Sequence, residues 1–114
     1  MVKWDKDMFV KTRYTEQGQV KLTLTDLKDF PGMNPKVTLF SHARLAPGEQ
    51  VDYHSHEGEF EIYYILTGTG IYNDNGTEVP VAPGAITHNP SGSSHGLKNT
   101  GSETLEFIAL IVRD

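Results

Sequence analysis

The sequence contains no cysteine among its 114 residues. This absence excludes disulfide bonds, a thiolate metal site and a thiol nucleophile. Long hydrophobic runs are also missing, because the apolar stretch at residues 107–112 is far shorter than a membrane-spanning helix requires. Residues 1–7 lack the apolar centre of a signal peptide, so we expect a cytoplasmic protein without a membrane partner.

Basic residues are scarce as well. Lys and Arg total 10 against 15 Asp and Glu, which gives a formal net charge of −5. No basic stripe is present, so a nucleic-acid partner is not expected. Hydrophobic residues make up 37% and charged residues 22%, values that are ordinary for a folded protein. A chain of this length can bury one modest core, and we expect residues 1–114 to form a single domain.

Glycine and proline, by contrast, recur between short runs of β-branched, aromatic and aliphatic residues. This alternation predicts an all-β, antiparallel fold. The expected strands are residues 20–25, 36–45, 50–56, 59–67, 70–73, 77–81, 85–88, 95–99 and 104–112. Asn75-Gly76 is a strong hairpin signal, because both residues tolerate positive φ. The first thirty residues alternate less cleanly, and they either form an arm or add an edge strand.

Three histidines and one glutamate stand at spacings typical of a metal site: His54, His56, Glu61 and His95. Residues i and i+2 of a strand point to the same face, so His54 and His56 direct two imidazoles at one point. The gap before Glu61 is short enough for a turn, whereas His95 arrives from a distant segment. This donor set suits one divalent transition metal, namely Mn, Fe, Co, Ni, Cu or Zn, with positions left for water or substrate.

These residues lie within two longer patterns that resemble the motifs of the cupin superfamily. The first motif, G-x5-H-x-H-x4-E-x6-G, is matched over residues 48–68 by Gly48, His54, His56, Glu61 and Gly68. The second, G-x5-P-x-G-x2-H-x3-N, is matched over residues 84–99 by Gly84, Pro90, Gly92, His95 and Asn99. The resemblance implies a double-stranded β-helix, the jelly-roll or cupin barrel, with the metal near one mouth. It also implies a homodimer.

Other polar residues are candidates for binding a substrate beside the metal. Tyr63 shares the strand face of Glu61, so it either lines the pocket or packs in the core. Arg44 could hold a carboxylate or phosphate group, or it could be a solvated surface charge. His42 shares the strand face of Arg44, although a lone strand histidine is more often structural than part of a site.

Three further residues have expected supporting roles. Glu57 or Glu59 could orient one of the ligating histidines through a hydrogen bond, or both could belong to a solvated acidic rim. Asn99 is expected to bond the backbone or a turn rather than a metal. On the strand of Glu61, both faces are apolar, which favours one face toward a pocket and the other toward a second sheet or a partner subunit.

The function that the resemblance implies has two main alternatives. The first is a metal-dependent enzyme on a small carboxylate, diol or sugar-like substrate, with dioxygenase-, decarboxylase- or isomerase-like chemistry. No further acid or base stands out and little chain is left for a lid, which disfavours an oxalate decarboxylase in particular. The second is a non-catalytic module that binds or senses a small molecule or sugar. A storage-type barrel is disfavoured because all four ligands are present, and fold alone does not separate these classes.

Overall fold

The fold is built almost entirely from β-strands. The computed structural model describes residues 1–114 and contains a short 3-10 helix, η1 (Asp5–Asp7), followed by ten strands. The strands are β1 (Val10–Tyr14), β2 (Val20–Asp26), β3 (Val37–Leu45), β4 (Gln50–Ser55), β5 (Glu59–Thr67), β6 (Gly70–Asp74), β7 (Thr77–Val81), β8 (Ile86–Asn89), β9 (Ser94–Asn99) and β10 (Leu105–Arg113). The structure has no helix with the length and apolar character needed to cross a membrane.

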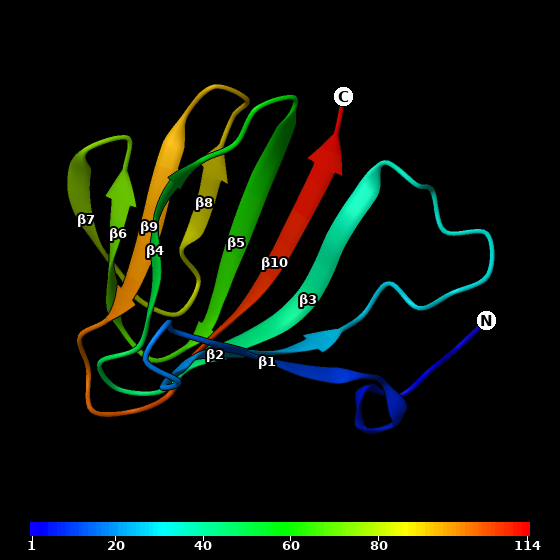
Figure 1. The fold of residues 1–114 in the computed structure, drawn as a ribbon, viewed down its shortest axis with the longest axis horizontal. Helices are drawn as coiled ribbons and strands as arrows, with labels where there is room; N and C mark the ends of the chain where they lie inside the picture. Colours follow the sequence, from blue (N-terminus) through cyan, green and yellow to red (C-terminus); the bar gives the residue numbers. More distant parts are fainter.

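The strands form two antiparallel sheets, which Figure 1 shows facing each other across the interior of the molecule. The six-stranded sheet has the order β1-β2-β3-β10-β5-β8, and the four-stranded sheet has the order β4-β9-β6-β7. Most neighbouring strands are distant in sequence, so the chain passes repeatedly from one sheet to the other. This winding places β4 beside β9, and the histidines of the two motifs therefore meet.

The nine strands expected from the sequence are all present, with ends that differ by no more than one residue. The hairpin between β6 and β7 has positive φ angles at Asn75 and Gly76, of 50° and 99°, as the Asn-Gly signal predicts. Of the two alternatives for the N-terminal residues, the structure shows the edge strand, because β1 pairs with β2 at the end of the six-stranded sheet.

Alternation along β5 places one face inward and the other outward, as expected. Glu61, Tyr63 and Ile65 are buried, with exposed fractions of 3%, 2% and 0%. The core lies between the two sheets and includes the fully buried apolar side chains of Leu45, Ile65, Leu97, Leu105 and Phe107. The burial of such side chains is the main favourable contribution to folding, at about 25 cal/mol per Å² of apolar surface removed from water.

The outer face of the six-stranded sheet is also apolar over several strands. Leu110 on β10 lies opposite Phe40 on one side and Ile62 on the other. Tyr64 pairs with Ile86, and these two side chains are 46% and 70% exposed. Phe40, Ile62 and Leu110 are partly exposed, so the apolar side chains of this face remain accessible to solvent.

Gly68 and Gly70 bring the end of β5 and the start of β6 against the neighbouring backbone. Gly68 has a φ of +82°, and a Cβ at this position would lie 2.6 Å from the carbonyl oxygen of Thr104 and 2.8 Å from the Cα of Leu105. A Cβ on Gly70 would lie 2.4 Å from the carbonyl oxygen of Lys98. Only glycine fits these two positions, which explains the glycine that ends the first sequence motif.

Candidate metal centre

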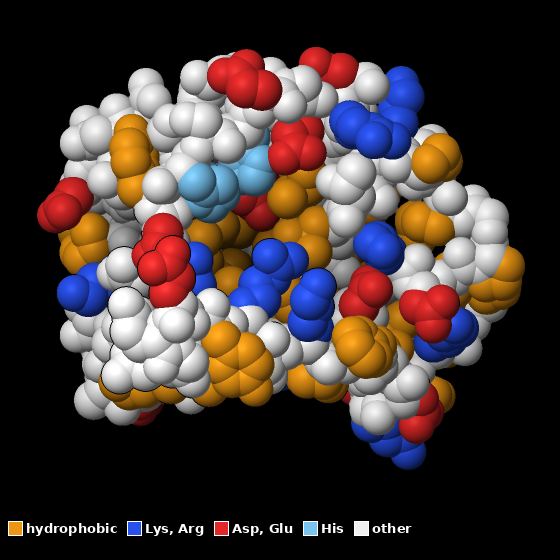
Figure 2. Space-filling view, in the orientation of Figure 1, with side chains coloured by type: hydrophobic (Ala, Val, Ile, Leu, Met, Phe, Trp, Pro, Cys, Tyr) orange, Lys and Arg blue, Asp and Glu red, His pale blue; other side chains and the backbone are white.

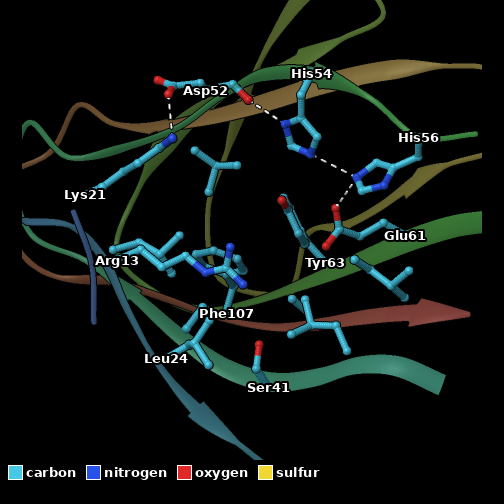
Figure 3. A pocket seen from close by; sticks show the side chains of 16 residues that line it. Arg13, Lys21, Leu24, Ser41, Asp52, His54, His56, Glu61, Tyr63 and Phe107 are labelled. Atoms are coloured by element: carbon cyan, nitrogen blue, oxygen red, sulfur yellow. Dashed lines mark hydrogen bonds and ion pairs between the residues drawn. The ribbon is translucent and has the colours of Figure 1, made fainter. Parts of the chain in front are cut away.

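Four side chains from both sheets converge at one point inside the barrel. His54 on β4 lies directly opposite His95 on β9, His56 follows the end of β4, and Glu61 projects from β5. Their ligand atoms all lie within 4.8 Å of one another. Glu61 Oε1 is 2.9 Å from His56 Nε2 and 2.7 Å from His95 Nε2, and the Nε2 atoms of His54 and His56 are 2.9 Å apart. The four predicted ligands therefore form one cluster. Figure 3 shows three of them, His54, His56 and Glu61, at the cavity.

Each histidine of the cluster has its other ring nitrogen engaged by an oxygen atom. The Nδ1 contacts are His54 to the Asp52 carbonyl at 2.6 Å, His56 to Glu59 Oε1 at 2.6 Å, and His95 to Tyr72 Oη at 2.8 Å. A carbonyl and a carboxylate can only accept, so Nδ1–H is the donor in the first two contacts. These contacts fix the orientation of the three rings, and in His54 and His56 they leave the Nε2 lone pair directed at the centre of the cluster.

The resulting arrangement suits a cation. Nε2 lone pairs 2.9 Å apart, with a carboxylate oxygen beside them, repel one another unless positive charge lies between them. His95 Nε2 is buried without a hydrogen-bond partner, although it lies only 2.7 Å from Glu61 Oε1. With Zn–N and Zn–O bonds of about 2.0–2.2 Å, adjacent ligand atoms are expected to be about 3 Å apart. The cluster therefore has the donors and the spacing for one divalent transition metal ion.

Two tyrosines support the buried half of the cluster. The ring of Tyr63 stacks on that of His95, with centroids 5.0 Å apart and an interplanar angle of 22°. Burial raises the pKa of Tyr63 well above its usual range, and the nearby carboxylate of Glu61 adds to the effect. Burial likewise raises the pKa of Tyr72 to about 12. Both phenols are therefore neutral near pH 7, and they position His95 without adding negative charge.

Glu59 is the acidic residue that orients a ligand, whereas Glu57 is exposed and has no such contact. We expect Glu59→Gln to lower metal affinity by about 10- to 100-fold, because loss of a carboxylate partner weakens the orientation and basicity of His56. Isothermal titration with Mn²⁺ measures the effect. Glu57→Gln removes the same charge and is the matched control; equal losses in both variants would show that net charge, and not the bond to His56, is responsible.

A cavity of about 320 Å³ opens in front of the cluster. Figure 2 shows this hollow with a hydrophobic floor, histidines on one side and Lys and Arg side chains on the opposite side. Its lining includes His54, His56, Glu61 and Tyr63, so the exposed side of the cluster faces the cavity. The apolar part of the wall is formed by Leu22, Leu24, Leu39, Ala43, Val51, Phe107, Ala109 and Ile111.

Of the three candidate substrate residues, only Tyr63 lies at the cavity. Tyr63 lines the cavity, as one of its two expected roles requires. His42 and Arg44 do not line it, since Ser41 and Ala43 of the same strand face inward and the alternate positions face outward. Both of these outward residues contact Glu106, with His42 Nε2 at 3.1 Å and Arg44 Nε at 3.6 Å from its Oε1.

The cations at the cavity are Arg13 and Lys21, which the sequence analysis does not single out. They belong to β1 and β2, the hairpin formed by the N-terminal residues. Lys21 is bound to Asp52 on β4, with Nζ 2.6 Å from the carboxylate, so this ion pair bridges the two sheets near the cavity. The residue pattern at 20–25 predicts strand β2. It does not show that the β1–β2 hairpin borders the cavity, so it could not identify Arg13 and Lys21 as cavity residues.

The two-sheet barrel and its His₃Glu cluster define a class, the small double-stranded β-helix proteins with a candidate metal centre in the barrel. Comparison with known proteins identifies the family. Residues 41–111 match the family model described as the Cupin domain, and the chain belongs to the cupin family. The expected fold is therefore confirmed.

Individual relatives support the same assignment. The oxalate-binding protein of Thermotoga maritima is 44% identical over 95 residues, which cover 83% of this chain and 78% of the relative. A crystal structure of a predicted oxalate decarboxylase from Thermotoga maritima matches all of this chain and all of its own, with a TM-score of 0.90 and 38% identity. A cupin 2 conserved barrel domain protein from Salinispora arenicola shares the fold, with a TM-score of 0.73 and 24% identity over 98% of this chain and 87% of its own.

Proposed function

We propose that this protein binds one divalent transition metal ion through His54, His56, Glu61 and His95, and that it binds a small carboxylate at that ion. Oxalate is the first candidate ligand. The observation that carries the proposal is the geometry of the cluster: four donors converge, and their exposed side opens into the cavity. The oxalate-binding protein, at 44% identity, is the relative that supports a carboxylate as the ligand.

The charges around the cavity favour an anionic ligand. Glu61 is the only carboxylate in the cluster, so a bound dication would leave one net positive charge there. Bound, the metal supplies a Lewis acid for oxygen ligands. Asp52 is the only other carboxylate that lines the cavity, and Lys21 neutralises it. The apolar wall lowers the local dielectric and strengthens the attraction for an anion.

Binding, rather than turnover, is the function that these groups support best. Decarboxylation of oxalate to formate requires a proton donor near the substrate. Hydrogen bonds from Lys21 and Gln50 lower the pKa of Asp52, so this carboxyl is ionised and held in an ion pair near neutral pH. The raised pKa of Tyr63 makes its phenol a poor acid. Neither group is suited to donate a proton to a bound carboxylate.

A metal-dependent reaction is the second candidate, and the match to the structure described as a predicted oxalate decarboxylase favours it. Metal-loaded protein incubated with oxalate, in air and without oxygen, tests this alternative through formate, CO₂ and O₂ uptake. More than one formate or CO₂ per chain would make the protein an enzyme. Binding without product would support a binding module.

The binding proposal is tested by calorimetry with protein loaded with Mn²⁺ and freed of excess metal. We expect one oxalate per chain to bind to the loaded protein and none to bind after chelation. Metal content is measured after the titration, because oxalate can itself remove a weakly held ion. Equal binding by loaded and metal-free protein, or no binding by either, would contradict the proposal.

We also propose that the protein forms a homodimer through the apolar outer face of the six-stranded sheet. Tyr64 and Ile86 form an exposed apolar pair on this face, and burying them in an interface would be favourable. Sedimentation at micromolar concentration is expected to give a mass near twice 12.7 kDa. Ile86→Asp is expected to shift the mass to that of one chain, whereas Val79→Asp on β7 of the other sheet is the control. A single-chain mass for the unmodified protein would refute the proposal.

A further inference from the structure

The cavity is larger and more apolar than oxalate requires. A volume of about 320 Å³ corresponds to the space of roughly ten water molecules in the liquid. Oxalate consists of two joined carboxylates and has no hydrocarbon surface to place against Leu24, Leu39, Val51 or Phe107, which line the wall. Apolar walls favour ligands with apolar surface, because both surfaces then leave water. A ligand that fills this cavity therefore has a hydrocarbon portion.

Arg13 supplies a second positive centre in the same cavity. Figure 3 shows its side chain extending from β1 into the cavity, on the side opposite His56 and Glu61. Lys21, the other cation there, is paired with Asp52, whereas Arg13 has no acidic partner in the chain. A guanidinium can bind a carboxylate through two parallel hydrogen bonds, and it is attracted more strongly beside an apolar wall than in water.

The cavity therefore presents three kinds of surface from one end to the other: the ligand cluster, the apolar wall and Arg13. The cluster, with a bound dication, accepts a carboxylate at one end of the cavity, and the apolar wall accepts a hydrocarbon chain. Arg13 can meet a second anionic group at the other end. A ligand with a single carboxylate would leave the charge of Arg13 unused, and oxalate does not present an apolar chain to the wall.

We infer that the preferred ligand is a dicarboxylate longer than oxalate, whose two carboxylates are separated by methylene groups, and that Arg13 selects it by binding the second carboxylate. One carboxylate binds at the metal centre, so the inference rests on the proposed function. Arg13 then determines specificity and takes no part in holding the metal, since it does not belong to the cluster.

Calorimetry on the Mn²⁺-loaded protein tests this inference with oxalate, malonate, succinate, glutarate and adipate, each compared with the monocarboxylate of equal carbon number. We expect at least one longer dicarboxylate to bind more tightly than oxalate and tenfold or more tightly than its matched monocarboxylate. Arg13→Ala is expected to remove about tenfold or more of that affinity, because charge-assisted hydrogen bonds are lost. Oxalate affinity is expected to fall by a smaller factor, because only the general attraction of the cavity for an anion is reduced, and Arg13→Lys is expected to retain part of the preference.

Lys98→Ala is the matched control, because it removes one positive charge from an exposed position on β9 that does not line this cavity. If oxalate binds and none of the longer dicarboxylates binds more tightly than oxalate, the inference is wrong while the proposed function stands. Equal losses in Arg13→Ala and Lys98→Ala would also overturn it, since only net charge would then matter. If metal-loaded protein binds no carboxylate, the proposed function fails and the inference fails with it.

Discussion

Replacing His95 by alanine is expected to lower the affinity of the protein for Mn²⁺ or Co²⁺ by about 100- to 1000-fold. Four-ligand zinc sites contribute roughly 10–16 kcal/mol of binding free energy, so the loss of one ligand costs about a quarter of it. His95 is the most buried member of the cluster, with an exposed fraction of 0%, and no neighbouring histidine can take its place. Titration calorimetry with purified, chelator-treated protein measures the change.

Two further variants separate metal binding from folding. His54→Ala removes a ligand that is only half-buried, and it is expected to lower metal affinity with a small effect on stability. His88→Ala removes an exposed histidine outside the cluster and is expected to bind metal like the unmodified protein. Metal affinities unchanged in both His95→Ala and His54→Ala would refute the assignment of the cluster as a metal centre.

Gly68→Ala is expected to lower the free energy of unfolding by about 2–5 kcal/mol. The new Cβ would lie 2.6 Å from the Thr104 carbonyl oxygen and 2.8 Å from the Leu105 Cα, and both atoms belong to a backbone that cannot move away like a side chain. The positive φ of +82° adds strain for a residue with a side chain. Small domains have about 5–15 kcal/mol of stability, so the loss is a large fraction of the total.

Gly48→Ala is the control for backbone strain alone. Gly48 has nearly the same φ, +84°, but a Cβ there would meet nothing within 4 Å. Its expected cost is about 1 kcal/mol. Urea unfolding followed by circular dichroism compares the two variants. Equal destabilisation would show that φ, and not the contact with residues 104 and 105, is what requires glycine at the end of the first motif.

The ligand cluster could be predicted from the sequence because its geometry follows from short-range rules. His54 and His56 are two residues apart on one strand, and the gap to Glu61 fits a turn between neighbouring strands. The position of His95 beside these residues depends on the overall fold, and the resemblance to the cupin motifs predicted that fold. The role of Asn99 followed in the same way: its side-chain amide donates to the carbonyl oxygens of Leu45 and Glu103 at 2.8 Å each.

The cavity residues were harder to predict because they depend on which face of each strand is covered. Along β3, alternation separates His42 and Arg44 from Ser41 and Ala43, but it does not by itself show which set faces the interior. Arg13 lies in a short N-terminal strand whose place at the cavity results from pairing with β2 at the sheet edge. Such contacts between distant elements leave no periodic signal in the sequence.

The absorption spectrum of the Co²⁺-loaded protein during titration with oxalate tests the central claim most directly, because cobalt d–d bands report the ligands on the metal. We expect bands that differ from those of Co²⁺ in buffer, that are absent from His95→Ala, and that shift to saturation at one oxalate per chain. A spectrum identical to that of free Co²⁺ would contradict the metal centre. A protein-bound spectrum that saturating oxalate leaves unchanged would contradict carboxylate binding at the metal.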